Sequence, residues 1–218
     1  GENGSGKSTL IEAIAVAAGF NPEGGSTGMR FATRSSHSAL NDSIRLVRGS
    51  RRPRDGFFLR AESFFNVASV VDGHEFVEPG EEVDEPGDDS AALPIRPLVE
   101  AYGGVSLHRR SHGESFLALV NNRFGDNGFY ILDEPEAALS VTGQLALLRA
   151  IAELVAHGSQ FIIATHSPIL TGYPHASIYE LGDSGFDQIA YQDTDQYQLT
   201  QSFLEAPERF LRRLLDDY

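Results

Sequence analysis

Three short apolar runs in the chain predict buried strands. Residues 129–132 and 161–164 each carry four apolar side chains in succession, and residues 57–59 carry three. A strand with one face in water alternates apolar and polar positions, whereas a strand covered on both faces is apolar throughout. These runs therefore predict an α/β fold, in which a mostly parallel sheet has helices on both of its faces.

Elsewhere, apolar positions recur at the three- and four-residue spacing of a helix. Helices are predicted over Ser8–Ala18, Ser111–Asn122, Val141–Ala156 and Pro207–Leu215. In the second of these, Phe116, Leu119 and Val120 lie on one face. Weaker patterns predict strands at 44–47, 177–181 and 188–191, a short helix at 62–71 and a loop at 21–36.

The composition is that of an ordinary globular protein. The chain has 218 residues, enough for a single domain with a sizeable core, and 41% of them are apolar. The absence of cysteine excludes disulfide frameworks and thiolate zinc sites. No apolar run reaches the roughly 18 residues of a membrane span, so we expect no membrane segment. The net charge of −14 argues against a generally basic, nucleic-acid-binding surface.

Charge is unevenly distributed along the chain. Residues 72–89 contain nine acidic side chains and no Lys or Arg, and Pro and Gly interrupt them. We interpret residues 72–95 as a solvated, mobile insert, with an acidic partner-docking segment as the alternative. A basic cluster precedes it, formed by Arg45, Arg48, Arg51, Arg52 and Arg54. This cluster is either a solvated surface or a contact for a nucleic-acid backbone.

The only lysine of the chain lies in a phosphate-binding motif. Residues 1–8 match G-x-x-x-x-G-K-[ST], whose backbone N–H groups surround a phosphate while the lysine reaches the β- and γ-phosphates. The candidate nucleotide-binding residues are Gly1, Asn3, Gly4, Ser5, Gly6, Lys7, Ser8 and Thr9. With the absence of cysteine, this motif favours the cytoplasm. A strand normally leads into such a loop and none precedes Gly1, so we expect that the chain lacks its first strand and binds ATP poorly as written.

Polar side chains follow two of the predicted strands. Asp133 and Glu134 come directly after the run 129–132, and His166 follows the run 161–164. Carboxyl ends of parallel strands meet at one edge of a sheet, where ligands bind. We expect Asp133 and the Ser8 hydroxyl to hold Mg²⁺, Glu134 to act as base for the attacking water, and His166 to contact the γ-phosphate. The alternatives are a turn capped by Asp-Glu-Pro and a structural histidine.

Taken in order, these motifs resemble an ABC-type ATPase. The residues that carry the resemblance are Gly1–Thr9, Ser111-His112-Gly113-Glu114-Ser115, Phe129–Glu134, Ala138-Leu139-Ser140 and His166. They are most similar to the soluble, non-transporter branch related to chromosome-structuring and DNA-repair ATPases. Within it, Ser-His-Gly-Glu-Ser resembles a family of small bacterial predicted ATPases. The resemblance covers nearly the whole chain.

The resemblance implies a P-loop NTPase fold of three layers, α/β/α, with a small subdomain of strands and helices. It also implies a homodimer of head-to-tail subunits with two ATP molecules between them. Ser111, Gly113 and Glu114 would then form a signature helix start that contacts the γ-phosphate held by the other subunit. Ala138–Ser140 would be the loop that crosses the dimer interface. Ser111 and Glu114 also match a capping box, and the two roles are compatible.

Two positions depart from the family pattern. His112 stands where such ATPases usually have a second glycine. In the segment where the family places a glutamine on Mg²⁺, this chain has Leu59-Arg60-Ala61-Glu62-Ser63, and Glu62 is our candidate replacement.

The function expected from these motifs is Mg²⁺-dependent ATP hydrolysis that drives a conformational switch. One alternative is a DNA-associated repair or defence ATPase that uses the arginine cluster. Residues 64–110 show no heptads, which excludes the long coiled-coil arm of repair-type relatives. A less favoured alternative is the ATP-binding subunit of a membrane transporter.

Overall fold

A mostly parallel sheet forms the centre of the structure, a computed structural model that describes residues 6–26, 39–47, 49, 52–61, 64, 111–182 and 185–216. Its strand order is β1–β2–β3–β4, with β2, β3 and β4 parallel and β1 antiparallel to β2. The strands are β1 (Gly25–Ser26), β2 (Asp55–Arg60), β3 (Gly128–Asp133) and β4 (Gln160–Ala164). The predicted α/β class with a mostly parallel sheet is confirmed.

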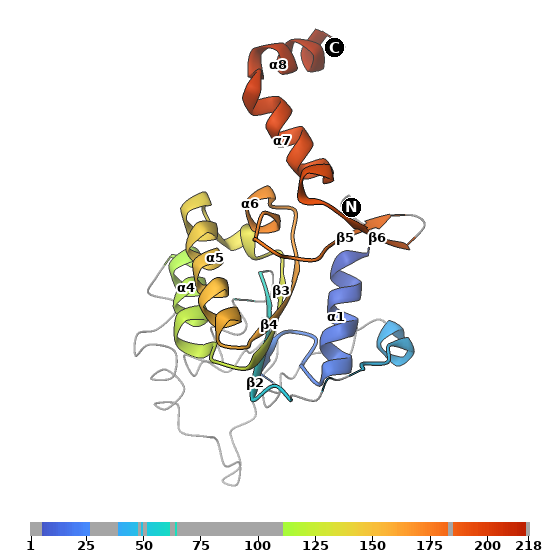
Figure 1. Cartoon of the computed structure of the whole chain (residues 1–218), viewed down its shortest axis with the longest axis vertical. Coiled ribbons are helices and arrows are strands. Elements are labelled where there is room, and N and C mark those ends of the chain that lie inside the picture. Colours follow the sequence, from blue (N-terminus) through green and yellow to red (C-terminus); the bar gives the residue numbers. More distant parts are fainter. Residues whose placement is uncertain are drawn as a thin grey trace, which may run out of the picture.

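Helices cover both faces of the sheet (Figure 1). The helices that do so are α1 (Lys7–Ala18) on one face and α4 (His112–Arg123) and α5 (Val141–Ala156) on the other. In β2, Phe57 and Leu59 belong to the core beneath α4 and α5, whereas Phe58 belongs to the core beneath α1. All three side chains are fully buried. Burial on both faces explains why this strand is apolar at successive positions.

The register of the sheet brings the carboxyl ends of the three parallel strands to one edge. Arg60, the last residue of β2, pairs with Asp133, the last residue of β3, and Asp133 pairs with Ala164 of β4. Two backbone bonds continue the ladder beyond the strands: Ala61 N–H donates to the Asp133 carbonyl at 3.1 Å, and Glu134 N–H donates to the Ala164 carbonyl at 2.9 Å. The residues that follow the strands therefore leave the sheet from fixed positions.

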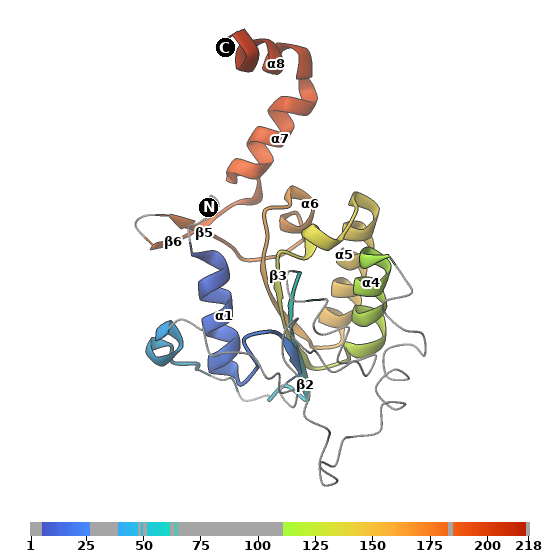
Figure 2. The same ribbon diagram turned by 180° about the vertical axis from the view of Figure 1, so that it is seen from behind.

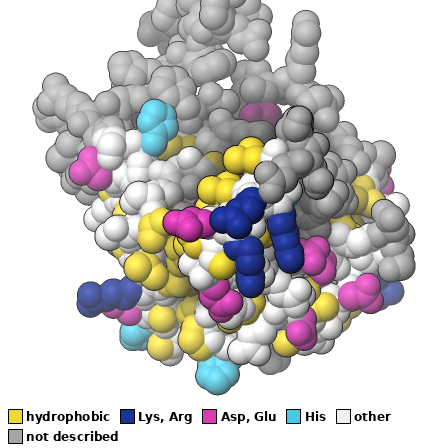
Figure 3. Space-filling model, turned by 90° about the horizontal axis from the view of Figure 1, so that it is seen from above, with side chains coloured by type: hydrophobic (Ala, Val, Ile, Leu, Met, Phe, Trp, Pro, Cys, Tyr) yellow, Lys and Arg dark blue, Asp and Glu magenta, His cyan; other side chains and the backbone are white. Residues whose placement is uncertain are grey.

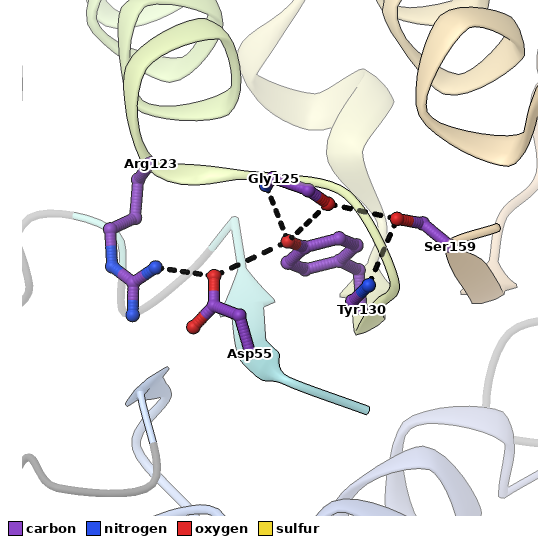
Figure 4. Close-up of polar contacts among 6 residues, drawn as sticks. Asp55, Arg123, Gly125, Tyr130 and Ser159 are labelled. Carbon is purple, nitrogen blue, oxygen red and sulfur yellow. Dashed lines mark hydrogen bonds and ion pairs between the residues drawn. The ribbon is translucent and has the colours of Figure 1, made fainter. Parts of the chain in front are cut away.

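A polar cluster closes the opposite edge of the sheet (Figure 4). Arg123 forms an ion pair with Asp55, and the Tyr130 hydroxyl lies 3.3 Å from the same carboxylate. Tyr130 also donates to the Gly125 carbonyl at 3.0 Å, which accepts a second bond from Ser159 Oγ at 2.8 Å. Burial raises the pKa of Tyr130 to about 12, so its hydroxyl keeps the proton that it donates. This edge is structural.

The C-terminal part of the chain ends in two helices that extend away from the sheet (Figure 2). Its elements are α6 (Pro168–Thr171), the hairpin β5 (Ile178–Gly182) and β6 (Gly185–Ile189), α7 (Asp195–Glu205) and α8 (Pro207–Asp216). Seen from this end, Lys and Arg side chains gather among apolar ones (Figure 3). The helices α7 and α8 expose apolar side chains, including Leu199, Leu204, Leu214 and Leu215. No helix among the described residues is long and apolar enough to cross a membrane.

The four predicted helices and the three apolar strands are confirmed. Each helix boundary differs from its prediction by at most one residue. Three short 3₁₀ helices complete the described structure, at Ala39–Ser43, Pro135–Ala138 and Tyr191–Asp193.

Several weaker predictions are wrong. Residues 44–47 form no strand, since no described strand pairs with them, and Val47 is 90% exposed. The predicted strand 177–181 is confirmed as β5, and 188–191 overlaps the end of β6, but these two strands pair with each other instead of adding to the main sheet as edge strands. The predicted loop 21–36 contains β1, and α7 was not predicted. The predicted insert 72–95 and all of the predicted helix 62–71 except Phe64 lie outside the described residues.

Candidate functional site

The amino end of α1 lies at the edge of the sheet where the three parallel strands end. Gly6 precedes the helix with φ of 87°, a left-handed conformation that side chains disfavour, and the chain turns there into the helix. The first N–H groups of a helix have no partner within it and are available to an anion. Lys7 and Ser8 are half-buried and Thr9 is exposed. The other predicted phosphate-loop residues, Gly1, Asn3, Gly4 and Ser5, lie outside the described residues.

Ser8 and Asp133 meet at this edge although 125 positions separate them. The Ser8 hydroxyl donates to Asp133 Oδ1 at 3.2 Å. Asp133 is 5% exposed, so its carboxylate is held by protein groups rather than by bulk water. The structure thus brings together two side chains predicted from different motifs. Both are hard oxygen donors, and both are directed to the same place.

Arg60 is a third member of this group and was not among the site residues predicted from the sequence. Its Nε lies 3.5 Å from Asp133 Oδ2, and its Nη1 donates to Glu12 Oε2 of α1 at 2.8 Å. The buried Arg60 Nε makes no hydrogen bond. Arg60 therefore links the strand-end carboxylate to α1 through ion pairs on both sides. Its position at the end of a predicted strand is the signal that could have identified it as a site residue. Glu62, the candidate predicted in this segment, lies outside the described residues.

Glu134 and His166 form a second pair beside Asp133. His166 Nε2 lies 3.8 Å from Glu134 Oε1, and both side chains are partly exposed. The backbone of Glu134 has φ of 50°, a left-handed conformation that is costly for a residue with a Cβ. Strain of this kind concentrates at functional sites. The backbone N–H of His166 donates to Glu136 Oε1 at 2.5 Å, so the segment after β3 fixes the turn after β4.

The start of α4 lies across the sheet from α1. The Ser111 hydroxyl accepts the Glu114 N–H, and Glu114 Oε2 accepts the Ser111 N–H at 3.0 Å. The capping-box alternative is therefore confirmed. A Cβ on Gly113 would stand 3.1 Å from the Ala138 carbonyl oxygen, so this position packs closely against the loop that follows Asp133. The helices α1 and α4 start on opposite faces of the sheet (Figure 1).

The arginine cluster lies apart from this site. Arg45, Arg52 and Arg54 are exposed, and Arg54 precedes β2, at the edge of the sheet opposite Asp133. Arg48 and Arg51 lie outside the described residues.

The oxygen atoms of Ser8 and Asp133 suit Mg²⁺ better than they suit a metal ion whose ligands all come from protein. Among the described residues, no group of three or more His, Cys, Asp or Glu could hold a metal ion. Mg²⁺ takes one or two protein oxygen ligands and completes its shell with water and substrate phosphates. Ser8 and Asp133 supply oxygens of that kind at the amino end of α1, beside the expected position of a phosphate.

Comparison with protein-family models, with curated proteins and with solved structures found no match to this chain. Arguments about function therefore rest on the motifs and on the site geometry.

Proposed function

We propose that the protein is an ATP hydrolase of the ABC-type, P-loop class that uses Mg²⁺. The observation that carries this proposal is the hydrogen bond between Ser8 and Asp133. One residue belongs to the phosphate-loop motif and the other ends a buried parallel strand, as expected for a site that holds a metal–triphosphate complex. A turn-capping role for Asp133 gives no reason for a contact with the first turn of α1.

In this proposal, Lys7 and the first N–H groups of α1 bind the β- and γ-phosphates. Ser8 and Asp133 would hold Mg²⁺, which would supply positive charge against the phosphates. Glu134 accepts a proton from the water that attacks the γ-phosphorus, and the bond to the β-phosphate oxygen breaks to release ADP. His166, 3.8 Å from Glu134, holds the water and the γ-phosphate in line. The residues contribute mainly position and charge.

A paired substitution tests this function. Lys7→Ala should weaken ATP binding by about 10- to 100-fold or more, because a charge-assisted contact to phosphate is lost. Glu134→Gln should keep ATP binding but lower kcat by about 100- to 10,000-fold, because the base is removed. Calorimetry for binding and phosphate release for turnover measure the two effects.

Glu153→Gln is the matched control for Glu134→Gln. Glu153 lies on the exposed side of α5, where its carboxylate pairs with Arg149. Its substitution should leave kcat within about twofold of the unsubstituted protein, as surface changes usually do. Unimpaired hydrolysis by Glu134→Gln, or unimpaired binding by Lys7→Ala, contradicts the roles given to these residues.

A further inference from the structure

Gln144 connects the loop after β3 to the turn after β4. It lies in the first turns of α5 and is 9% exposed. Its Nε2 donates to the Leu139 carbonyl at 3.3 Å, and its Oε1 accepts the Ser167 hydroxyl proton at 2.5 Å. Leu139 belongs to the predicted interface loop Ala138–Ser140, and Ser167 follows His166 directly. One buried side chain thus bridges two segments of the candidate site.

The directions of these bonds are fixed by the groups involved. Ser167 Oγ accepts N–H bonds from Ile169 at 3.1 Å and from Leu170 at 3.2 Å, as the cap of α6. Its acceptor capacity is therefore used, and its single proton remains for the Gln144 oxygen. A carbonyl can only accept, so the amide NH₂ of Gln144 must face Leu139. Neither segment can shift alone without breaking a buried hydrogen bond.

A second bond ties the same two segments together. Glu136, also in the segment after β3, accepts the backbone N–H of His166. The turn that carries His166 is thus held by Glu136, between β3 and α5, and by Gln144, in the first turns of α5. A displacement of the loop Ala138–Ser140 would be transmitted to His166 by Gln144 and Glu136.

We propose that Gln144 is a positioning residue that couples the loop Ala138–Ser140 to His166. A second copy of the chain that seats on this loop would, through Gln144 and Ser167, set His166 against Glu134 for hydrolysis. This inference rests on the proposed ATP hydrolysis and adds to it the connection between assembly and chemistry. Gln144 touches no substrate. Its effect belongs to kcat, because its side chain bonds to Leu139 and Ser167, which lie in the segments after β3 and β4 rather than in α1.

Two substitutions test the coupling. Gln144→Met keeps the volume but removes both hydrogen bonds, and Ser167→Ala removes the bond from the other side. Each should lower kcat about tenfold or more while KM for ATP changes less than about twofold, because a misplaced catalytic group slows the chemical step without weakening binding. Ser167→Thr retains the hydroxyl and the cap, and should restore most of kcat.

Ser159→Ala is the matched control. Ser159 and Ser167 are both 6% exposed, and both hydroxyls bond to buried backbone groups, but Ser159 lies at the opposite edge of the sheet. Its loss should lower the free energy of unfolding about as much as Ser167→Ala does, by about 1 kcal/mol, and leave kcat unchanged. Equal kcat for Gln144→Met and Ser159→Ala overturns the coupling while ATP hydrolysis stands. An unsubstituted protein that does not hydrolyse ATP even at saturating ATP concentration overturns both proposals.

Discussion

At the scale of single residues, Arg60 shows how a side chain outside any motif can organise a site. It stands between Asp133 of β3 and Glu12 of α1, and it is largely buried. Two carboxylates in such surroundings need a positive partner, because burying an uncompensated charge is costly. Arg60 supplies that charge at the place where Mg²⁺ and phosphate are expected.

We expect Arg60→Gln to lower the free energy of unfolding by about 1–3 kcal/mol, the range for buried charged groups that lose their partner. Glutamine keeps much of the length of arginine but carries no charge, so Asp133 and Glu12 would each lose an ion pair. Urea unfolding at neutral pH measures the change.

Arg149→Gln provides the comparison for this substitution. Arg149 forms an ion pair of 3.1 Å with Glu153, but the two side chains are 83% and 64% exposed. Exposed pairs of this spacing contribute about 0.5 kcal/mol or less. An equal decrease in the free energy of unfolding for the two variants would mean that the buried ion pairs of Arg60 stabilise the fold no more than an exposed pair does.

At the scale of elements, Ser111 at the start of α4 has two roles, the observed cap of the helix and the proposed contact with a phosphate. Two substitutions of this residue distinguish them. Ser111→Asp retains an acceptor that caps the helix but loses the hydroxyl bond to Glu114 Oε2 and adds a second carboxylate beside it, so the free energy of unfolding should fall by about 1 kcal/mol, as in Ser111→Ala. The new negative charge would repel a γ-phosphate, so ATP hydrolysis should be lost. Ser111→Ala should lose about 1 kcal/mol of stability through the cap alone. Hydrolysis by Ser111→Asp at the unsubstituted rate would leave the serine only its capping role.

Elements with local signals could be predicted, and elements that depend on a partner could not. The Ser111–Glu114 box and the helical stripe marked α4 correctly, and the apolar runs marked β2, β3 and β4. Residues 44–47 carry a similar pattern, but a strand requires a neighbour that the sequence does not reveal. In α7 no side chain is buried, so its sequence had no apolar stripe facing a core.

The candidate site likewise contains residues whose contacts could be predicted from the sequence and residues whose contacts could not. Ser8 and Asp133 could be predicted to meet, because a phosphate loop and a strand end converge at one sheet edge. Arg60 and Gln144 could not, because their roles depend on the register between β2 and β3 and on the packing of α5 against a turn. An arginine at the end of a strand and a glutamine inside a helix are both common, so neither residue stands out in the sequence.

At the scale of the whole molecule, the sheet separates the two halves of the proposed site. Lys7 begins a helix on one face, and Ser111 caps a helix on the other (Figure 1). In the proposed function, Ser111 contacts the ATP that Lys7 of another copy of the chain holds. A head-to-tail pair related by a two-fold axis forms two such sites at once.

Mixing two inactive variants tests this arrangement. Lys7→Ala and Ser111→Asp each spoil a different half of the site, so a mixed dimer contains one site with Lys7 and Ser111 both intact. Random exchange should therefore restore about a quarter of the unsubstituted ATPase rate, since half of the dimers are mixed and each has one of two sites intact. Mixing Lys7→Ala with Glu134→Gln should restore nothing, because these two residues serve the same half and no intact site can form. Activity that stays absent in the first mixture, under conditions where subunits exchange, would place the complete site within a single chain.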